Sequence, residues 1–140
     1  MAHSIQTDRL LIRNFKASAI KDYYEYASIP GLGEQAGWVH HESIEESKEV
    51  LKGLIKRDDV FAIVLKSENK VIGSISISPR SYDDNLPSSL KQRSLGYLLS
   101  TKYWHHGYAS EAIKAITHYA FEYLKCDILW ASSLADNLRS

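Results

Sequence analysis

The spacing of hydrophobic and polar positions changes along the chain, which predicts a domain built from both strands and helices. Residues 10–12 are apolar between two arginines and predict a short strand. From residue 14 to 28 apolar residues recur every three or four positions, so we expect a helix that ends at Ile29-Pro30-Gly31. Its expected buried face consists of Ala19, Tyr23, Tyr26 and Ala27.

A second helix is predicted from a start signal at Ser43. Ser43 and Glu46 fit a capping box, in which each side chain accepts a hydrogen bond from a backbone N–H at the start of the helix. Basic residues 56–57 suit the negative pole of the helix dipole at the other end. The expected buried stripe is Val50, Leu51, Leu54 and Ile55.

The middle of the chain predicts a hairpin of two strands. Residues 60–65 are apolar on both faces, as in an interior strand, and residues 67–70 turn the chain into a second strand over 71–77. The serines of that strand fit either a cleft or an exposed sheet face. The two expected faces are Val71, Ile75 and Ile77 on one side, and Ser74 and Ser76 on the other.

The last third predicts a loop over 79–92, a strand over 94–99, a helix over 107–125 and a strand over 127–134. The order of elements is then β-α-α-β-β-β-α-β, which is a mixed α+β domain. The apolar stripe of the long helix is Ala109, Ala112, Ile113, Ile116, Ala120 and Leu124.

Composition excludes several classes of protein. With 140 residues, of which 44% are hydrophobic and 24% charged, residues 1–140 are expected to form one domain. The 17 basic and 17 acidic residues cancel, so neither nucleic acid nor an anionic membrane is an expected partner. We find no apolar run of ~20 residues and no secretory signal, so a cytoplasmic protein is expected.

The six histidines and the one cysteine do not predict a metal site. The pairs His40-His41 and His105-His106 are adjacent in sequence, and neighbouring side chains point apart rather than chelating one ion. A His-Glu-x-x-His motif is absent from the sequence. We therefore expect no metal, and we interpret Cys126 as a packed thiol.

The candidate chemistry lies where the strand over 94–99 leads into the long helix. Gly107 and Ala109 are small, so backbone N–H groups there can approach a ligand closely. The start of a helix adds about half a positive charge, which suits a pyrophosphate group. Taken alone, this Gly-x-Ala pattern also fits an ordinary helix start.

Four blocks in the same order resemble the GNAT superfamily of acyl-CoA-dependent N-acyltransferases, and most of all its RimJ/RimL branch. These blocks are residues 7–13, 61–75, 95–112 and 130–140. The resemblance implies a GNAT fold, with a mixed, mostly antiparallel central sheet flanked by helices. It also implies transfer of an acetyl group from acetyl-CoA to a primary amine, either a protein N-terminus or a small molecule, in a ternary complex. There a base or a water chain removes the proton of the amine and a strand N–H stabilises the oxyanion.

The resemblance also implies which residues bind the cofactor. The segment from Tyr97 through Leu98 and Leu99 to Ser100 would line the pantetheine arm, and Asn137 would lie beside it near the reacting end. The pyrophosphate would meet the backbone of His105, His106, Gly107, Tyr108, Ala109 and Ser110. Trp38 follows a loop on the acceptor side of the family, so it is a candidate for the acceptor site, with a core residue as the alternative.

Two positions depart from the pattern of the family. The RimJ/RimL loop commonly reads Trp-Gly-x-Gly, and here His105 replaces the first glycine, where it either crowds the loop or adds a cation beside phosphate. Many relatives carry an acidic residue at the position of Ser94, so no carboxylate general base is identified and the catalytic residues stay unassigned.

Relatives continue beyond the position of Ser140 into another helix and a final strand, so a C-terminally shortened GNAT domain is expected. Such shortening would uncover apolar surface around Trp130 and favour a homodimer. The alternative function is then a shortened domain that binds CoA, or self-associates, without turnover. A third interpretation is an interaction module that binds no small ligand.

Overall fold

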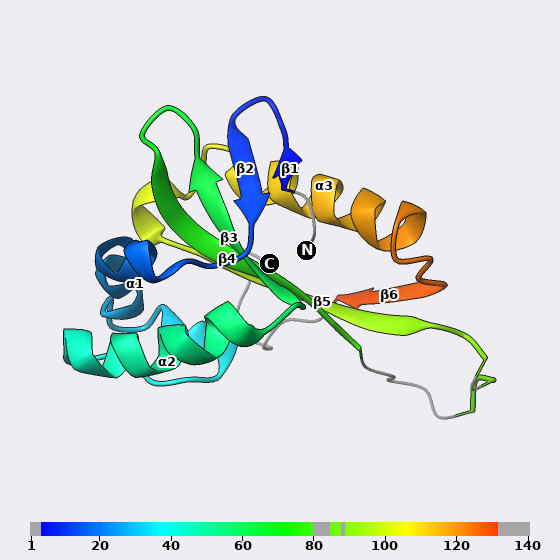
Figure 1. Cartoon of the computed structure of the whole chain (residues 1–140), viewed down its shortest axis with the longest axis horizontal. Coiled ribbons are helices and arrows are strands. Elements are labelled where there is room, and N and C mark those ends of the chain that lie inside the picture. Colours follow the sequence, from blue (N-terminus) through cyan, green and yellow to red (C-terminus); the bar gives the residue numbers. More distant parts are fainter. Residues whose placement is uncertain (1–3, 80–84, 88, 132–140) are drawn as a thin grey trace.

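The computed structural model describes residues 4–79, 85–87 and 89–131, and it has one sheet with helices on both faces (Figure 1). The strands are β1 (Ile5–Gln6), β2 (Leu10–Arg13), β3 (Val60–Leu65), β4 (Lys70–Pro79), β5 (Gln92–Leu99) and β6 (Ile128–Ala131). The helices are α1 (Ile20–Ala27), α2 (Ile44–Lys56) and α3 (Tyr108–Glu122). Short 3-10 turns are η1 (Ala17–Ala19), η2 (Gly33–Ala36) and η3 (Thr101–Tyr103).

The six strands follow one another in the sheet in chain order, β1-β2-β3-β4-β5-β6. Every neighbouring pair is antiparallel except β5 and β6, which are parallel. β6 pairs with β5 from Gln92 to Leu95, whereas β4 pairs with it as far as Leu99. The fold is thus the mixed, mostly antiparallel sheet flanked by helices that the sequence predicted.

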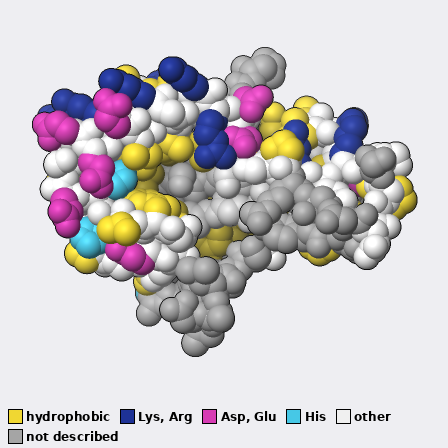
Figure 2. All heavy atoms as spheres, turned by 90° about the horizontal axis from the view of Figure 1, so that it is seen from below, with side chains coloured by type: hydrophobic (Ala, Val, Ile, Leu, Met, Phe, Trp, Pro, Cys, Tyr) yellow, Lys and Arg dark blue, Asp and Glu magenta, His cyan; other side chains and the backbone are white. Residues whose placement is uncertain are grey.

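Each face of the sheet carries its own hydrophobic core. α3 packs on one face through Ala112, Ile116 and Ala120, against the sheet residues Ile12, Phe61, Ile63, Ile72, Ile75 and Ile77. α1 and α2 cover the other face with Tyr23, Tyr26 and Leu51, against Ala62, Val64, Val71 and Leu98. Figure 2 shows this second side, where charged side chains lie on the outer surface and hydrophobic ones line the hollow beside it. Both amphipathic predictions for α1 and α3 are confirmed.

A β-bulge in β4 overturns the predicted faces of that strand. Ile63 pairs with Gly73 and Val64 with Val71, so Ile72 is an additional residue between these pairs. Val71 therefore packs in the α1–α2 core, opposite the face of Ile75 and Ile77, with which we predicted it. Simple alternation cannot reveal an inserted residue, because the bulge shifts the two-residue period by one position.

The structure also corrects two of the helix predictions. α1 begins at Ile20, after the η1 turn, rather than at residue 14. α2 begins as predicted, with the Ser43 hydroxyl accepting from the Glu46 N–H at 3.2 Å, but Val50 and Ile55 are 40% and 36% exposed. The buried face of α2 is centred on Ser47 and Leu51, because the Ser47 hydroxyl bonds to His41 Nδ1 at 2.7 Å inside the interface.

The remaining differences concern element bounds. The short strand β1 was not predicted, since two residues show no periodicity, and α3 ends at Glu122 rather than at residue 125. β4 extends to Pro79 and β5 starts at Gln92, so the predicted loop between them is shorter. Parts of that loop, and residues 132–134 of the predicted last strand, lie outside the described residues.

Candidate active-site cleft

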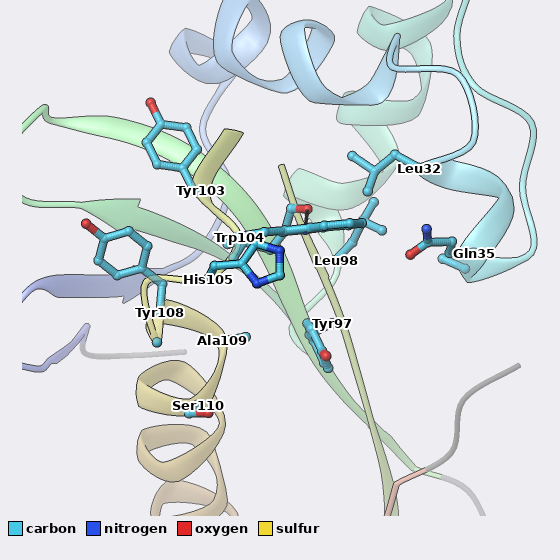
Figure 3. Close-up of a pocket in the computed structure, with 13 residues that line it drawn as sticks. Leu32, Gln35, Tyr97, Leu98, Tyr103, Trp104, His105, Tyr108, Ala109 and Ser110 are labelled. Atoms are coloured by element: carbon cyan, nitrogen blue, oxygen red, sulfur yellow. Dashed lines mark hydrogen bonds between the residues drawn. The ribbon is translucent and has the colours of Figure 1, made fainter. Parts of the chain in front are cut away.

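A cavity of about 320 Å³ lies where the C-terminal end of β5 meets the start of α3. Figure 3 shows that its walls come from η2, from β5 and from the turn between η3 and α3. The 13 lining residues are Leu32, Gln35, Ala36, Tyr97, Leu98, Leu99, Tyr103, Trp104, His105, Gly107, Tyr108, Ala109 and Ser110. Segments far apart in the sequence therefore meet at one cleft.

The sheet turns an edge of β5 toward this cavity. Within the described chain, the β6 pairing stops at Leu95, and residues 97–99 of β5 line the cavity instead. The indole Nε1 of Trp104 donates to the Leu99 carbonyl at 2.8 Å, which fixes the ring across the end of the strand. An edge of this kind can accept an extended ligand as if the ligand were a further strand.

A left-handed turn joins η3 to α3. His105 has φ +68° and Gly107 has φ +80°, and Gly107 is the N-cap of the 15-residue α3. Positive φ suits glycine but strains residues with a side chain, so His105 is held in a strained backbone conformation. The turn leaves the first N–H groups of α3 at the side of the cavity, where the helix dipole favours an anion.

The lining of the cavity carries no carboxylate, lysine or arginine among the 13 residues. Its titratable groups are the imidazole of His105 and the phenols of Tyr97, Tyr103 and Tyr108. An aliphatic arm fits such walls, and the absence of carboxylates removes like-charge repulsion toward a phosphate group. The lining also offers no carboxylate that could act as a general base.

Tyr103 forms a wall of the cavity rather than an acid within it. Its hydroxyl donates to Glu68 Oε1 at 2.8 Å, and in Figure 3 it points away from the cavity. Burial raises the pKa of Tyr103, and the hydrogen bond to Glu68 raises it further. The phenol therefore stays protonated and fixed at neutral pH.

The loop that supplies Leu32, Gln35 and Ala36 to the cavity is held by one carboxylate. Glu34 accepts from the Gly31 N–H at 3.0 Å and from the His40 N–H at 3.2 Å, and lies 2.9 Å from His40 Nδ1. The His40 side chain, followed by its backbone N–H, lowers the pKa of Glu34 to about 2. Glu34 thus holds the loop in the conformation that forms this wall of the cavity.

We expect acidification to loosen this loop progressively between about pH 4.5 and pH 2. The pKa of Glu34 is lowered from 4.5, so its stabilisation is complete above about 4.5 and is lost as the pH falls through about 2. Exchange or chemical shift of the His40 amide, followed by NMR from pH 7 to 2, measures this. Glu34→Gln should loosen the loop already at pH 7, whereas Glu42→Gln at an exposed neighbour should not. A midpoint near 4.5 would contradict the role of Glu34.

The structure brings eight of the predicted site residues together at the cavity: Tyr97, Leu98, Leu99, His105, Gly107, Tyr108, Ala109 and Ser110. Ser100 is not among the lining residues, because it is 1% exposed and its N–H donates to the Ile72 carbonyl at 2.8 Å. His106 is exposed and also outside the lining. Asn137 lies outside the described residues.

Trp38 packs in the α1–α2 core rather than at the cavity. Its ring lies 5.1 Å from that of His41, and a Cβ on Gly33 would meet it at 2.5 Å. Five lining residues were not predicted from the sequence: Leu32, Gln35, Ala36, Tyr103 and Trp104. Only Trp104 carried a local signal, since it lies beside the Gly-x-Ala pattern.

We expect His105→Gly to raise the free energy of unfolding by up to about 1 kcal/mol. Glycine adopts the left-handed backbone conformation of this position without the strain that a side chain causes. Acetyl-CoA binding should be preserved. Lys125→Gly, at φ +55° and away from the cavity, is the matched control and should stabilise similarly. Thermal melting and calorimetry measure both effects, and a clear loss of affinity in His105→Gly alone would show that the imidazole helps to hold phosphate.

The fold and the cleft are of the GNAT class. The chain belongs to this family, since the family described as "Acetyltransferase (GNAT) domain" matches residues 9–140. Among curated proteins it is similar to the uncharacterized N-acetyltransferase YnaD of Bacillus subtilis (strain 168), with 27% identity over 97% of this chain and 76% of the relative. GNAT domains generally use acetyl-CoA and act on amine acceptors.

Solved structures show the same fold. A GNAT-family acetyltransferase from Bacillus anthracis superimposes with a TM-score of 0.80 at 24% identity, over 96% of this chain and 76% of that chain. A protein from Vibrio cholerae, provisionally named a ribosomal-protein-serine acetyltransferase, gives 0.77 at 21% identity over the same shares. Among described residues, no three His, Cys, Asp or Glu side chains gather where they could hold a metal ion. Nor does any described helix have the length and apolar character to cross a membrane.

Proposed function

We propose that this chain transfers an acetyl group from acetyl-CoA to a primary amine, as an N-acetyltransferase of the RimJ/RimL type. The observation that carries the proposal is the continuous cleft from the edge of β5 to the N-terminus of α3. The strand edge suits the amide-containing pantetheine arm, and the helix start suits the pyrophosphate. Acetyl-CoA supplies the acetyl group as a thioester when it is bound.

The residues present fit this ligand. Tyr97, Leu98 and Leu99 would lie along the arm, and the turn from His105 to Ser110 would surround the pyrophosphate. Gly107 lines the cavity, and a Cβ built at this position would lie 3.4 Å from Arg9 Nη2. We retain Ser100, His106 and Asn137 as candidate contacts, through backbone groups or near the reacting end.

The acceptor side of the cleft is the wall formed by Leu32, Gln35 and Ala36. None of these side chains is charged, so the wall favours a neutral amine over a polycation. A neutral amine is the form that attacks a thioester, and its proton would pass to water, since none of the 13 described lining residues carries a carboxylate that could accept it. The acceptor is a protein N-terminus or a small amine, and the provisional name of the Vibrio cholerae protein supports the first.

The organisation of the protein forms part of the same proposal. Residues 1–140 constitute one GNAT domain, and the protein acts in the cytoplasm. The expected homodimer, with pairing near Trp130, stays a prediction. Size-exclusion chromatography with light scattering measures it.

A paired assay of binding and turnover tests the function. Calorimetry measures acetyl-CoA affinity, and a thiol reagent measures CoA release in the presence of a Ser- or Ala-starting peptide, or of a small primary amine. We expect release that depends on the amine. Binding without release for any amine would support the alternative, a GNAT domain without turnover, which is the second candidate because the described lining residues include no carboxylate.

A further inference from the structure

The segment before β2 is hydrogen-bonded to the start of α3, although about a hundred residues separate the two in sequence. Arg9 Nε donates to Glu111 Oε1 at 2.8 Å, and the Arg9 backbone N–H donates to Glu111 Oε2 at 2.9 Å. The Thr7 hydroxyl donates to the same Oε2. Glu111 lies in the first turn of α3, so one carboxylate ties the N-terminal segment to the helix that begins at the cleft.

The guanidinium of Arg9 also touches the turn itself. Its Nη1 donates to the His106 carbonyl at 2.8 Å, and its Cζ lies 4.5 Å from the ring centroid of Tyr108. Its Nη2 lies 3.4 Å from where a Cβ on Gly107 would be. Arg9 therefore meets three consecutive residues of the turn as well as Glu111.

These contacts set the orientation of the peptide between His106 and Gly107. In a trans peptide the carbonyl and the following N–H point in opposite directions. Because Arg9 holds the His106 carbonyl, the Gly107 N–H points away from Arg9. Gly107 lines the cavity, whereas Arg9 is not among its lining residues.

Arg9 also balances a negative charge near an anion site. Burial alone would raise the pKa of Glu111, but hydrogen bonds from Thr7 and from Arg9 outweigh it and lower the pKa below its ordinary value. Glu111 is therefore ionised at neutral pH, one turn from the proposed pyrophosphate position. The Arg9 guanidinium compensates that charge without itself entering the cavity.

We propose that Arg9 is a positioning residue of the cofactor site, which holds the turn from His105 to Gly107 with its N–H groups toward the pyrophosphate. Arg9 acts through the His106 carbonyl and Glu111, and it does not touch the cofactor. The inference rests on the proposed function for its ligand, whereas the contacts of Arg9 with His106 and Glu111 are present in the free protein. The two parts can therefore be tested separately.

Hydrogen exchange of the free protein tests whether Arg9 holds the turn before α3 in place. In Arg9→Gln we expect the hydrogen-bonded amides at the start of α3, beginning with Glu111, whose N–H donates to the Gly107 carbonyl at 3.1 Å, to exchange about tenfold faster or more, with the sheet amides unchanged. Arg57→Gln is the matched control, since Arg57 Nε also lies 2.8 Å from a carboxylate, that of Asp59, and its side chain is 48% exposed against 45% for Arg9. Unchanged exchange of these α3 amides in Arg9→Gln would overturn the inference, whether or not the protein binds CoA.

Calorimetry with coenzyme A and with pantetheine tests the consequence. We expect Arg9→Gln to weaken coenzyme A binding by about tenfold or more, and to leave pantetheine, which has no pyrophosphate, unaffected. The double variant Arg9→Gln with Glu111→Gln should recover part of the loss, because it removes the uncompensated carboxylate. Wild-type protein that binds no coenzyme A would contradict the proposed function. Wild-type and Arg9→Gln proteins of equal affinity would contradict the inference alone.

Discussion

Replacing Gly107 by tryptophan is expected to weaken acetyl-CoA binding by at least about tenfold, ~1.4 kcal/mol. Gly107 has φ +80°, a backbone conformation that strains any residue with a side chain. It is also the N-cap of α3, where close approach of the backbone to an anion matters most. A large ring at this position would press against Arg9 and displace the turn whose N–H groups are proposed to meet the pyrophosphate.

The control for this variant is Gly53→Trp. Gly53 lies on the exposed side of α2, and nothing lies within 4 Å of a Cβ built there. It receives the same side chain at a helix that is remote from the lining, so its acetyl-CoA affinity should equal that of the wild type. Calorimetry on folded protein, checked by melting, compares the two. Equal affinity in Gly107→Trp and Gly53→Trp would show that the cofactor site is assigned to the wrong turn.

Gly73→Ala is expected to destabilise the protein by about 3 kcal/mol, the upper end of the usual range for overpacking. A Cβ on Gly73 would clash with the Leu98 carbonyl oxygen and would lie 3.0 Å from the Leu99 Cα. Both are backbone atoms of β5, so no side-chain rotation can relieve the clash. The strands would have to separate at the point where β5 lines the cavity.

Gly96→Ala is the matched control for Gly73→Ala. It adds the same methyl group to the same pair of strands, but the new Cβ would lie 3.2 Å from the Ser76 hydroxyl, the end of a side chain that can rotate. We expect a change of less than about 1 kcal/mol. Chemical denaturation gives both values. If the two alanine variants had equal stability, the tight register of β4 and β5 would be wrong.

The sequence predicted the elements whose periodicity is long and regular. The fully apolar segment over 60–65 and the 3.6-residue stripe of α3 correspond to β3 and to the helix that covers one face of the sheet. The bulge at Ile72 escaped prediction, since it arises from the pairing of two strands and not from either strand alone. The exposure of Val50 and Ile55 depends likewise on how α2 is seated, through Ser47 and His41.

The candidate site likewise has one part that the sequence predicted and one part that only the folded structure reveals. Residues of the cleft that belong to the strand–turn–helix segment were predicted because they are close in sequence and share a motif. Leu32 and Gln35 reach the cavity from η2, whose position is set by Glu34 and by packing against distant elements. The role of Arg9 could not be predicted for the same reason, since its contacts with His106 and Glu111 exist only in the folded protein.

A calorimetric titration of this 140-residue chain with acetyl-CoA shows whether the cleft between β5 and α3 binds this cofactor. We expect one site per chain with a dissociation constant of about 1 μM, equivalent to ~8 kcal/mol. Competition by coenzyme A would confirm that the nucleotide end contributes to binding. Absence of binding up to about 1 mM acetyl-CoA, with the protein folded, would contradict the claim that the cleft between β5 and α3 is an acetyl-CoA site.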